Sequence, residues 1–136
     1  MQVPLAGELA RAYLAGSRMI DPLPYPRSRQ QFRVACHLPA RARNAWHAVE
    51  GSCRNLSLQG MLLTCEGEPV PVGESVDLQL ELPVGGSVRV CGEVRYHCEL
   101  PGEHAPAMGI LFTNMAEGHL ARLRGFLDAA QRLGGL

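Results

Sequence analysis

The chain contains no lysine, and it carries no net charge at neutral pH. All 13 of its basic residues are arginine, and 13 acidic residues balance them. Proteins that bind nucleic acids or membrane surfaces through charge usually carry a basic excess. The balance therefore argues against DNA, RNA and membrane surfaces as partners, and only the spacing of the arginines stays informative.

Long apolar runs and a secretory leader are also missing. No stretch reaches the roughly 18 apolar residues that a membrane-spanning helix needs, and Glu8 and Arg11 interrupt the apolar N-terminus. The five cysteines are scattered and form no C-x-x-C pair: Cys36, Cys53, Cys65, Cys91 and Cys98. This pattern favours reduced thiols over a disulfide framework. We therefore expect a cytoplasmic protein without membrane insertion.

Catalytic signatures are absent as well, because the sequence has no G-x-S-x-G, no H-E-x-x-H and no phosphate-binding glycine loop. Two histidines adjoin cysteines, as Cys36 with His37 and His97 with Cys98. Neighbours in a strand point to opposite faces, so neither pair readily chelates one metal. We predict neither an enzyme nor a metal protein, and no cofactor.

Between about residues 32 and 113, apolar and polar residues alternate with a period of two. SVDLQLEL (75–82) alternates apolar with polar residues, PVGG follows as a turn, and SVRVCGEVRYHC (87–98) alternates again. Four further strand candidates are VACHL, AWHAV, GMLLTC and AMGILFT. Several short strands with one apolar face predict an all-β core, built as a small antiparallel barrel or sandwich. We assign Phe32 and Trp46 to that core.

Helical periodicity marks both ends of the chain. Residues 4–18 predict a short amphipathic helix, and three prolines in DPLPYPR predict an extended linker after it. Residues 116–135 carry an apolar stripe and end in two glycines, which predicts a helix packed across one end of the barrel. We therefore divide the chain into a helix and linker (1–25) and a main domain (26–136).

The segment RSRQQFR places Arg29 and Arg33 four residues apart, just after the linker. The simplest interpretation of such a pair is a solvated basic turn. A guanidinium group also offers a planar fork of donors that matches phosphate oxygens and the O6/N7 edge of guanine. Two such groups on one tether suit a compact anionic guanine nucleotide.

The segment NLSLQG (55–60) offers a second set of polar groups. Asn55 and Ser57 are two residues apart, so on a strand they share the outward face while Leu56 and Leu58 point into the core. Gly60 lacks a Cβ, which permits a close ligand approach or a bulge. Alone, the segment is also what an ordinary strand end with a turn glycine looks like.

Together the two segments resemble the PilZ domain family, whose members bind cyclic di-GMP. The family pattern is R-x-x-x-R followed some twenty residues later by [D/N]-x-S-x-x-G. Later strands are similar too, with Gly109 and Phe112 at the closing G-x-x-F, and the resemblance covers about residues 26–128. It implies a six-stranded antiparallel Greek-key β-barrel with a C-terminal α-helix, to which this chain adds the short N-terminal helical extension.

The resemblance also implies residue roles. Arg29 and Arg33 would wrap the ligand, Asn55 and Ser57 would hydrogen-bond a guanine, and Gly60 would keep the ligand side of the barrel open. Residues that flank the first motif or lie on an outward strand face are secondary candidates: Arg27, Ser28, Gln30 and Arg95.

The function implied is a bacterial second-messenger receptor that binds cyclic di-GMP and passes the signal to an unidentified protein partner. A ligand-independent adaptor of the same fold is the alternative, and the oligomeric state, including a homodimer, is left open. We expect residues 21–33 to be mobile without ligand and ordered with it, which would reposition the helix of residues 4–18.

Overall fold

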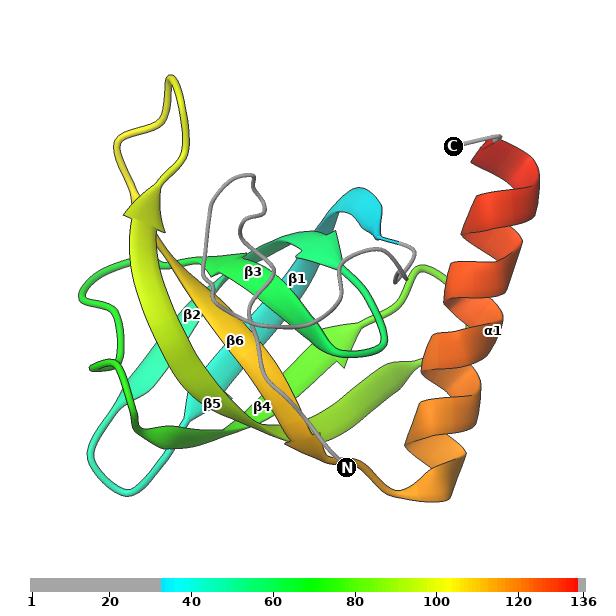
Figure 1. Cartoon of the computed structure of the whole chain (residues 1–136), viewed down its shortest axis with the longest axis horizontal. Helices are drawn as coiled ribbons and strands as arrows, with labels where there is room; N and C mark the ends of the chain where they lie inside the picture. The colour runs from blue at the N-terminus through cyan, green and yellow to red at the C-terminus, as the bar shows by residue number, and fades with distance from the viewer. Residues whose placement is uncertain (1–32, 135–136) are drawn as a thin grey trace.

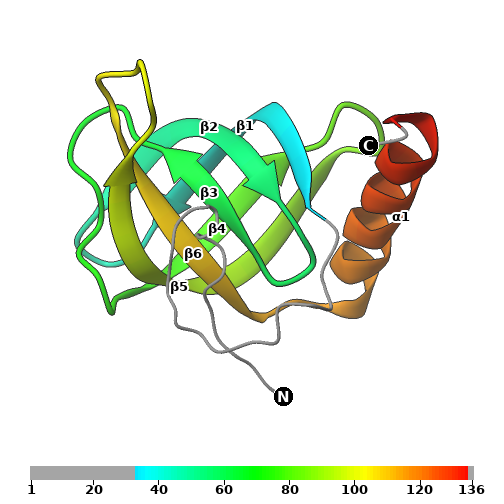
Figure 2. The same cartoon turned by 45° about the horizontal axis from the view of Figure 1, so that its top comes forward.

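The computed structural model describes residues 33–134, which form a closed six-stranded barrel with one helix beside it (Figures 1 and 2). The elements are β1 (Val34–Arg43), β2 (Ala48–Leu56), β3 (Gly60–Thr64), β4 (Ser75–Glu81), β5 (Ser87–Glu99), β6 (Pro106–Asn114) and α1 (Glu117–Gly134). The order around the barrel is β1-β2-β3-β6-β5-β4, with every neighbouring pair antiparallel. Because β4 closes against β1, strands β4-β1-β2-β3 form a Greek key. The predicted fold is confirmed.

The alternation in β4 and β5 builds the barrel wall as the sequence predicts. Val76, Leu78 and Leu80 of β4 are 3%, 2% and 1% exposed, and every second residue of the strand faces outward. In β5, Val88 and Val94 are fully buried in the same interior. Each such side chain contributes about 1.5–3 kcal/mol by leaving water, so this interior is the main source of stability.

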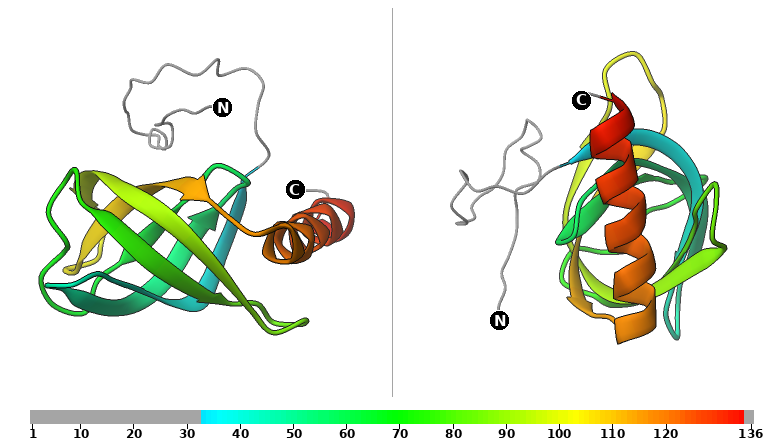
Figure 3. Two further views of the ribbon diagram at one scale, coloured as in Figure 1. Left: turned by 90° about the horizontal axis from the view of Figure 1, so that it is seen from below. Right: turned by 90° about the vertical axis from the view of Figure 1, so that its right-hand side faces the viewer.

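Helix α1 lies across one end of the barrel, as predicted, where it contacts β5 and β1 (Figures 1 and 3). Its Leu123 and Leu127 belong to the buried core, and Phe126 and Ala130 pack against that core. Glu117 in the first turn and Arg132 in the last complement the helix dipole. The predicted C-terminal helix and its apolar stripe are confirmed.

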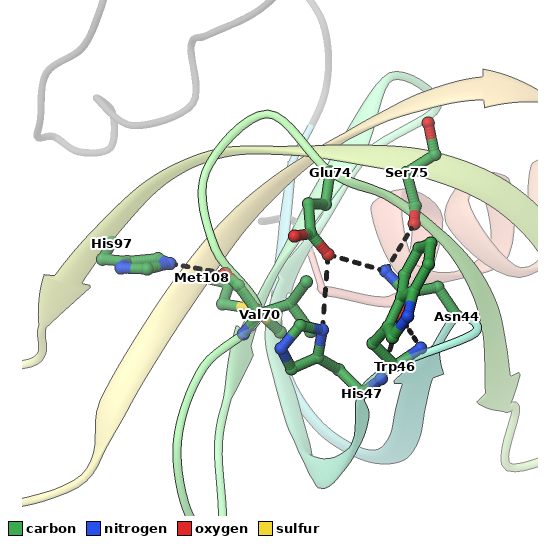
Figure 4. A network of polar contacts seen from close by, with 8 residues as sticks. All are labelled: Asn44, Trp46, His47, Val70, Glu74, Ser75, His97 and Met108. Atoms are coloured by element: carbon green, nitrogen blue, oxygen red, sulfur yellow. Dashed lines mark hydrogen bonds and ion pairs between the residues drawn. The ribbon is translucent and has the colours of Figure 1, made fainter.

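The turn between β1 and β2 differs from the prediction. Trp46 is 80% exposed, and β2 begins only at Ala48, so a strand over residues 45–49 and a core role for Trp46 are both wrong. The cause is Asn44, whose Oδ1 accepts the backbone N–H groups of Trp46 and His47, each at 2.9 Å. Figure 4 shows this turn held against Glu74, whose Oε1 accepts from Asn44 Nδ2 at 2.9 Å.

Several predictions fall outside the described residues: the helix of residues 4–18, the proline-rich linker, Phe32 and the boundary at residue 25. Within residues 33–134, no helix combines the length and apolar character that a membrane crossing requires. In the same range, no three His, Cys, Asp or Glu side chains gather as metal ligands would.

Candidate functional site

The pairing of β1 with β2 brings the end of the first motif to the second. Val34 pairs with Leu56, and Ala35 pairs with Asn55. Arg33 is half-buried directly before β1, so its backbone lies beside the point where β2 ends and Ser57 begins. Two segments more than twenty residues apart in sequence thus become neighbours on one side of the barrel.

Asn55 lies at an irregular point of the sheet. It pairs with Ala35 on one side and Leu62 on the other, and the register with β3 shifts between Cys53 and Asn55. Such an irregularity breaks the strict alternation of faces, so Arg54 and Asn55 are both half-buried. Among the described residues the Asn55 side-chain amide has no hydrogen-bond partner.

Ser57 does not share a strand face with Asn55, so that prediction is wrong. Strand β2 ends at Leu56, and Ser57 is only 3% exposed at the start of a tight turn. Its Oγ accepts the Gln59 N–H at 3.1 Å, and its own N–H donates to the Gly60 carbonyl at 3.0 Å. Serine competes for backbone groups in this way in turns. Ser57 therefore holds the turn that connects β2 to β3.

Gly60 begins β3 at a close approach between two backbones. It pairs with Leu111 of β6, and a Cβ added to it would lie 2.2 Å from the Ile110 carbonyl oxygen. Gln59, just before it, accepts the Phe112 N–H at 2.7 Å. The barrel itself thus requires a glycine here, whatever role the residue has toward a ligand.

A bidentate ion pair that no sequence motif indicates flanks Asn55. Arg54 of β2 donates to Glu103 of the β5–β6 loop through Nη1 to Oε1 at 2.9 Å and Nη2 to Oε2 at 2.5 Å. The hydrogen bonds to Arg54 lower the pKa of Glu103, and those to Glu103 raise the pKa of Arg54. No sequence spacing links two residues so far apart, because the barrel closure alone brings them together.

Arg95 faces outward as predicted, but it is not part of this cluster. It lies on β5, and β3 and β6 separate that strand from β2. Three strand spacings amount to about 14 Å along the barrel wall. Arg27, Ser28, Arg29 and Gln30 lie outside the described residues.

A second polar feature is a hollow of about 380 Å³ on the outside of β1, β4 and β5, beside the start of α1. Arg41, Arg43 and Arg89 line it together with Asp77. Among the described residues, the guanidinium groups of Arg43 and Arg89 have no partner. The arginines and Asp77 come from three adjacent strands, β1, β4 and β5. The sequence alone does not show that they lie together, because that depends on the strand order.

The comparisons with known proteins decide the family. A family model described as the PilZ domain matches residues 27–129, about three quarters of the chain. The chain belongs to the PilZ domain family. The predicted resemblance is thereby confirmed, while a comparison with curated proteins found no match.

Solved structures share the fold of this PilZ domain. The inhibitor of motility MotI/DgrA of Bacillus subtilis is 20% identical with a TM-score of 0.68, over 79% of this chain and 53% of that one. The PilZ domain of YcgR from Escherichia coli with c-di-GMP is 16% identical with a TM-score of 0.67, over 80% of this chain and 95% of that one. A longer YcgR structure in complex with c-di-GMP is 15% identical with a TM-score of 0.66, over 79% and 47%. The PilZ chain thus spans about half the length of MotI and of the longer YcgR.

Proposed function

We propose that this PilZ domain is a cyclic di-GMP receptor that passes the nucleotide signal to a protein partner. The supporting observation is the β1–β2 register, which sets Arg33 beside the end of β2, close to Asn55. The Asn55 side-chain amide has no hydrogen-bond partner among the described residues. The YcgR PilZ domain of the same fold was solved with c-di-GMP.

The proposed contacts follow from the chemistry of each side chain. Arg29 and Arg33 supply the planar donors for guanine O6 and N7 and for the phosphates. Asn55 accepts from, and donates to, a guanine edge. Ser57, buried in its turn, keeps Asn55 and Gly60 in place and still has a hydroxyl proton to donate. Arg54 stays paired with Glu103 and limits one side of the site.

Titration calorimetry with cyclic di-GMP on the full chain tests the proposal. Arg33→Ala and Arg29→Ala should each weaken binding more than tenfold, since a charge-assisted hydrogen bond contributes about 1.5–3 kcal/mol. Arg43→Ala is the matched control, because Arg43 lies at the other end of the same strand and should leave the affinity unchanged.

Either of two results would overturn the proposal. One is a double variant, Arg29→Ala with Arg33→Ala, that binds cyclic di-GMP with the affinity of the wild type. The other is a wild-type chain that does not bind the nucleotide. Either outcome would favour the ligand-independent adaptor. Hydrogen exchange over residues 21–33, with and without the nucleotide, tests whether binding orders that segment, as the switch proposed from the sequence requires.

A further inference from the structure

Two cysteines face each other across β1 and β2, next to both motifs. Cys36 Sγ lies 3.8 Å from Cys53 Sγ and donates to the Cys53 carbonyl oxygen at 3.3 Å. Cys53 is fully buried, whereas Cys36 is half-buried. Cys36 is thus the partly exposed member of the pair, and its sulfur atom contacts the sulfur atom of the buried Cys53.

Both cysteines lie where the strand pairing is irregular. Cys36 falls in the register shift between Ala35 and Leu38, and Cys53 borders the shift that precedes Asn55. A disulfide needs the sulfur atoms about 1.8 Å closer than they are, since an S–S bond is about 2.05 Å long. Because regular hydrogen bonding is already interrupted at both positions, the backbone can follow this movement at low cost.

The surroundings make Cys36 the more reactive thiol. The side-chain hydrogen bond between Cys36 and Cys53 lowers the pKa of Cys36, as does the nearby positive charge of Arg54, although burial opposes both effects. The same contact and full burial raise the pKa of Cys53. Burial raises the pKa of Cys65 to about 11 and also raises the pKa values of Cys91 and Cys98. Because the thiolate is the nucleophile, Cys36 should react before the other four.

We propose that Cys36 and Cys53 are a modification site, a dithiol that hydrogen peroxide converts into a disulfide. The Cys36 thiolate attacks one peroxide oxygen, the O–O bond breaks, and the departing hydroxide takes up the proton that Cys36 has lost. The sulfur of Cys53 then attacks the sulfenic acid of Cys36, the S–O bond breaks, and the Cys53 proton leaves with that hydroxide. Two electrons pass from the thiols to the peroxide, and two water molecules form.

The position of the pair connects this chemistry to the candidate site. Cys53 Sγ donates to the Asn55 carbonyl oxygen at 3.6 Å, and Cys36 follows Arg33 by three residues. Oxidation removes that donor and joins the strands that carry the two halves of the site. The inference concerns the thiols alone, so it does not depend on cyclic di-GMP binding.

Mass spectrometry of the reduced full chain after treatment with hydrogen peroxide tests the proposal. We expect the intact monomer to lose two hydrogen atoms and a non-reducing digest to contain the peptides of Cys36 and Cys53 joined together. In Cys53→Ala, the reaction should stop at a Cys36 sulfenic acid that dimedone traps. Cys91→Ser, which removes an exposed cysteine outside the pair, should form the disulfide at the wild-type rate.

Two results would overturn the proposal. One is oxidation that appears first at Cys65, Cys91 or Cys98 while Cys36 and Cys53 stay reduced. The other is a disulfide between two copies of the chain in place of the internal one. Both results are read on the wild-type chain, so they hold even if a variant of the buried Cys53 fails to fold. Neither outcome affects the nucleotide titration, which judges the proposed receptor function separately.

Discussion

Replacing Gly60 by alanine separates the two roles that the motif glycine can have. If the glycine serves only to admit the ligand, Gly60→Ala should bind poorly but fold normally. The structure instead predicts that the substitution destabilises the fold first, because the new Cβ would lie 2.2 Å from the Ile110 carbonyl oxygen and 3.5 Å from the Leu111 Cα. The obstacle is backbone of the paired strand, which cannot rotate away as a side chain can.

The size of the effect follows from this distance. Relieving the contact requires β3 and β6 to separate by about 1 Å, and overpacking of this kind costs about 1–3 kcal/mol. We place Gly60→Ala near the upper end, at about 3 kcal/mol, because two paired strands must move. With a urea slope of about 1.5 kcal/mol per M for a chain of this size, the unfolding midpoint should fall by about 2 M.

Gly125→Ala is the matched control for the urea experiment, since a Cβ added there, in the middle of α1, would meet nothing within 4 Å beyond its chain neighbours and its own helix backbone. There alanine should stabilise the chain by about 0.5–1 kcal/mol through helix propensity. A Gly60→Ala variant with the wild-type midpoint and impaired cyclic di-GMP binding would refute the packing argument and assign the glycine to the ligand.

Three further predictions concern the site and its surroundings. Cyclic di-AMP should bind at least tenfold more weakly than cyclic di-GMP in calorimetry, because adenine has a donor where guanine has O6, at about 1–3 kcal/mol per bidentate contact; equal affinity would mean phosphate contacts alone. The lowered pKa of Glu103 implies stability that is present above its unfolded value of about 4.3 and lost as pH falls through the folded value. The wild type should therefore exceed Glu103→Gln in urea midpoint at neutral pH, and a gap that persists well below pH 4 would contradict the ion pair. Trp46→Ala should change stability by less than about 0.5 kcal/mol, and acrylamide should quench Trp46 fluorescence in the native state; a buried emission spectrum would contradict its exposure.

The strands that the sequence predicts best are those with one apolar face and one polar face. Residues 75–82 alternate without a break, and β4 spans Ser75–Glu81 with the expected inward side chains. The helix α1 is equally clear, since Leu123 and Leu127 lie on its buried stripe. In these elements burial alone decides the structure, and burial is what the residue pattern records.

The errors arise where a polar side chain bonds to the backbone. Asn44 ends β1 by accepting two N–H groups, which turns Trp46 out of the core, and Ser57 ends β2 by accepting the Gln59 N–H. Ser52 and Asn55 lie within β2, so the presence of these residue types alone does not locate a turn. The Arg54–Glu103 pair was missed for another reason, because it depends on how the strands close into a barrel.

The spacing between the two motifs has a physical cause in the β1–β2 hairpin. In an antiparallel pair, residues at equal distances from the turn meet, so the turn at residues 44–47 brings Arg33 to the end of β2. Inserting or deleting one residue within β1 or β2 would turn the side chains beyond that point to the opposite face of the sheet. Lengthening or shortening the turn would leave the strand pairing unchanged. The separation of about twenty residues is therefore the length of two strands and one turn. The β1–β2 register therefore determines whether one ligand could reach both Arg33 and Asn55.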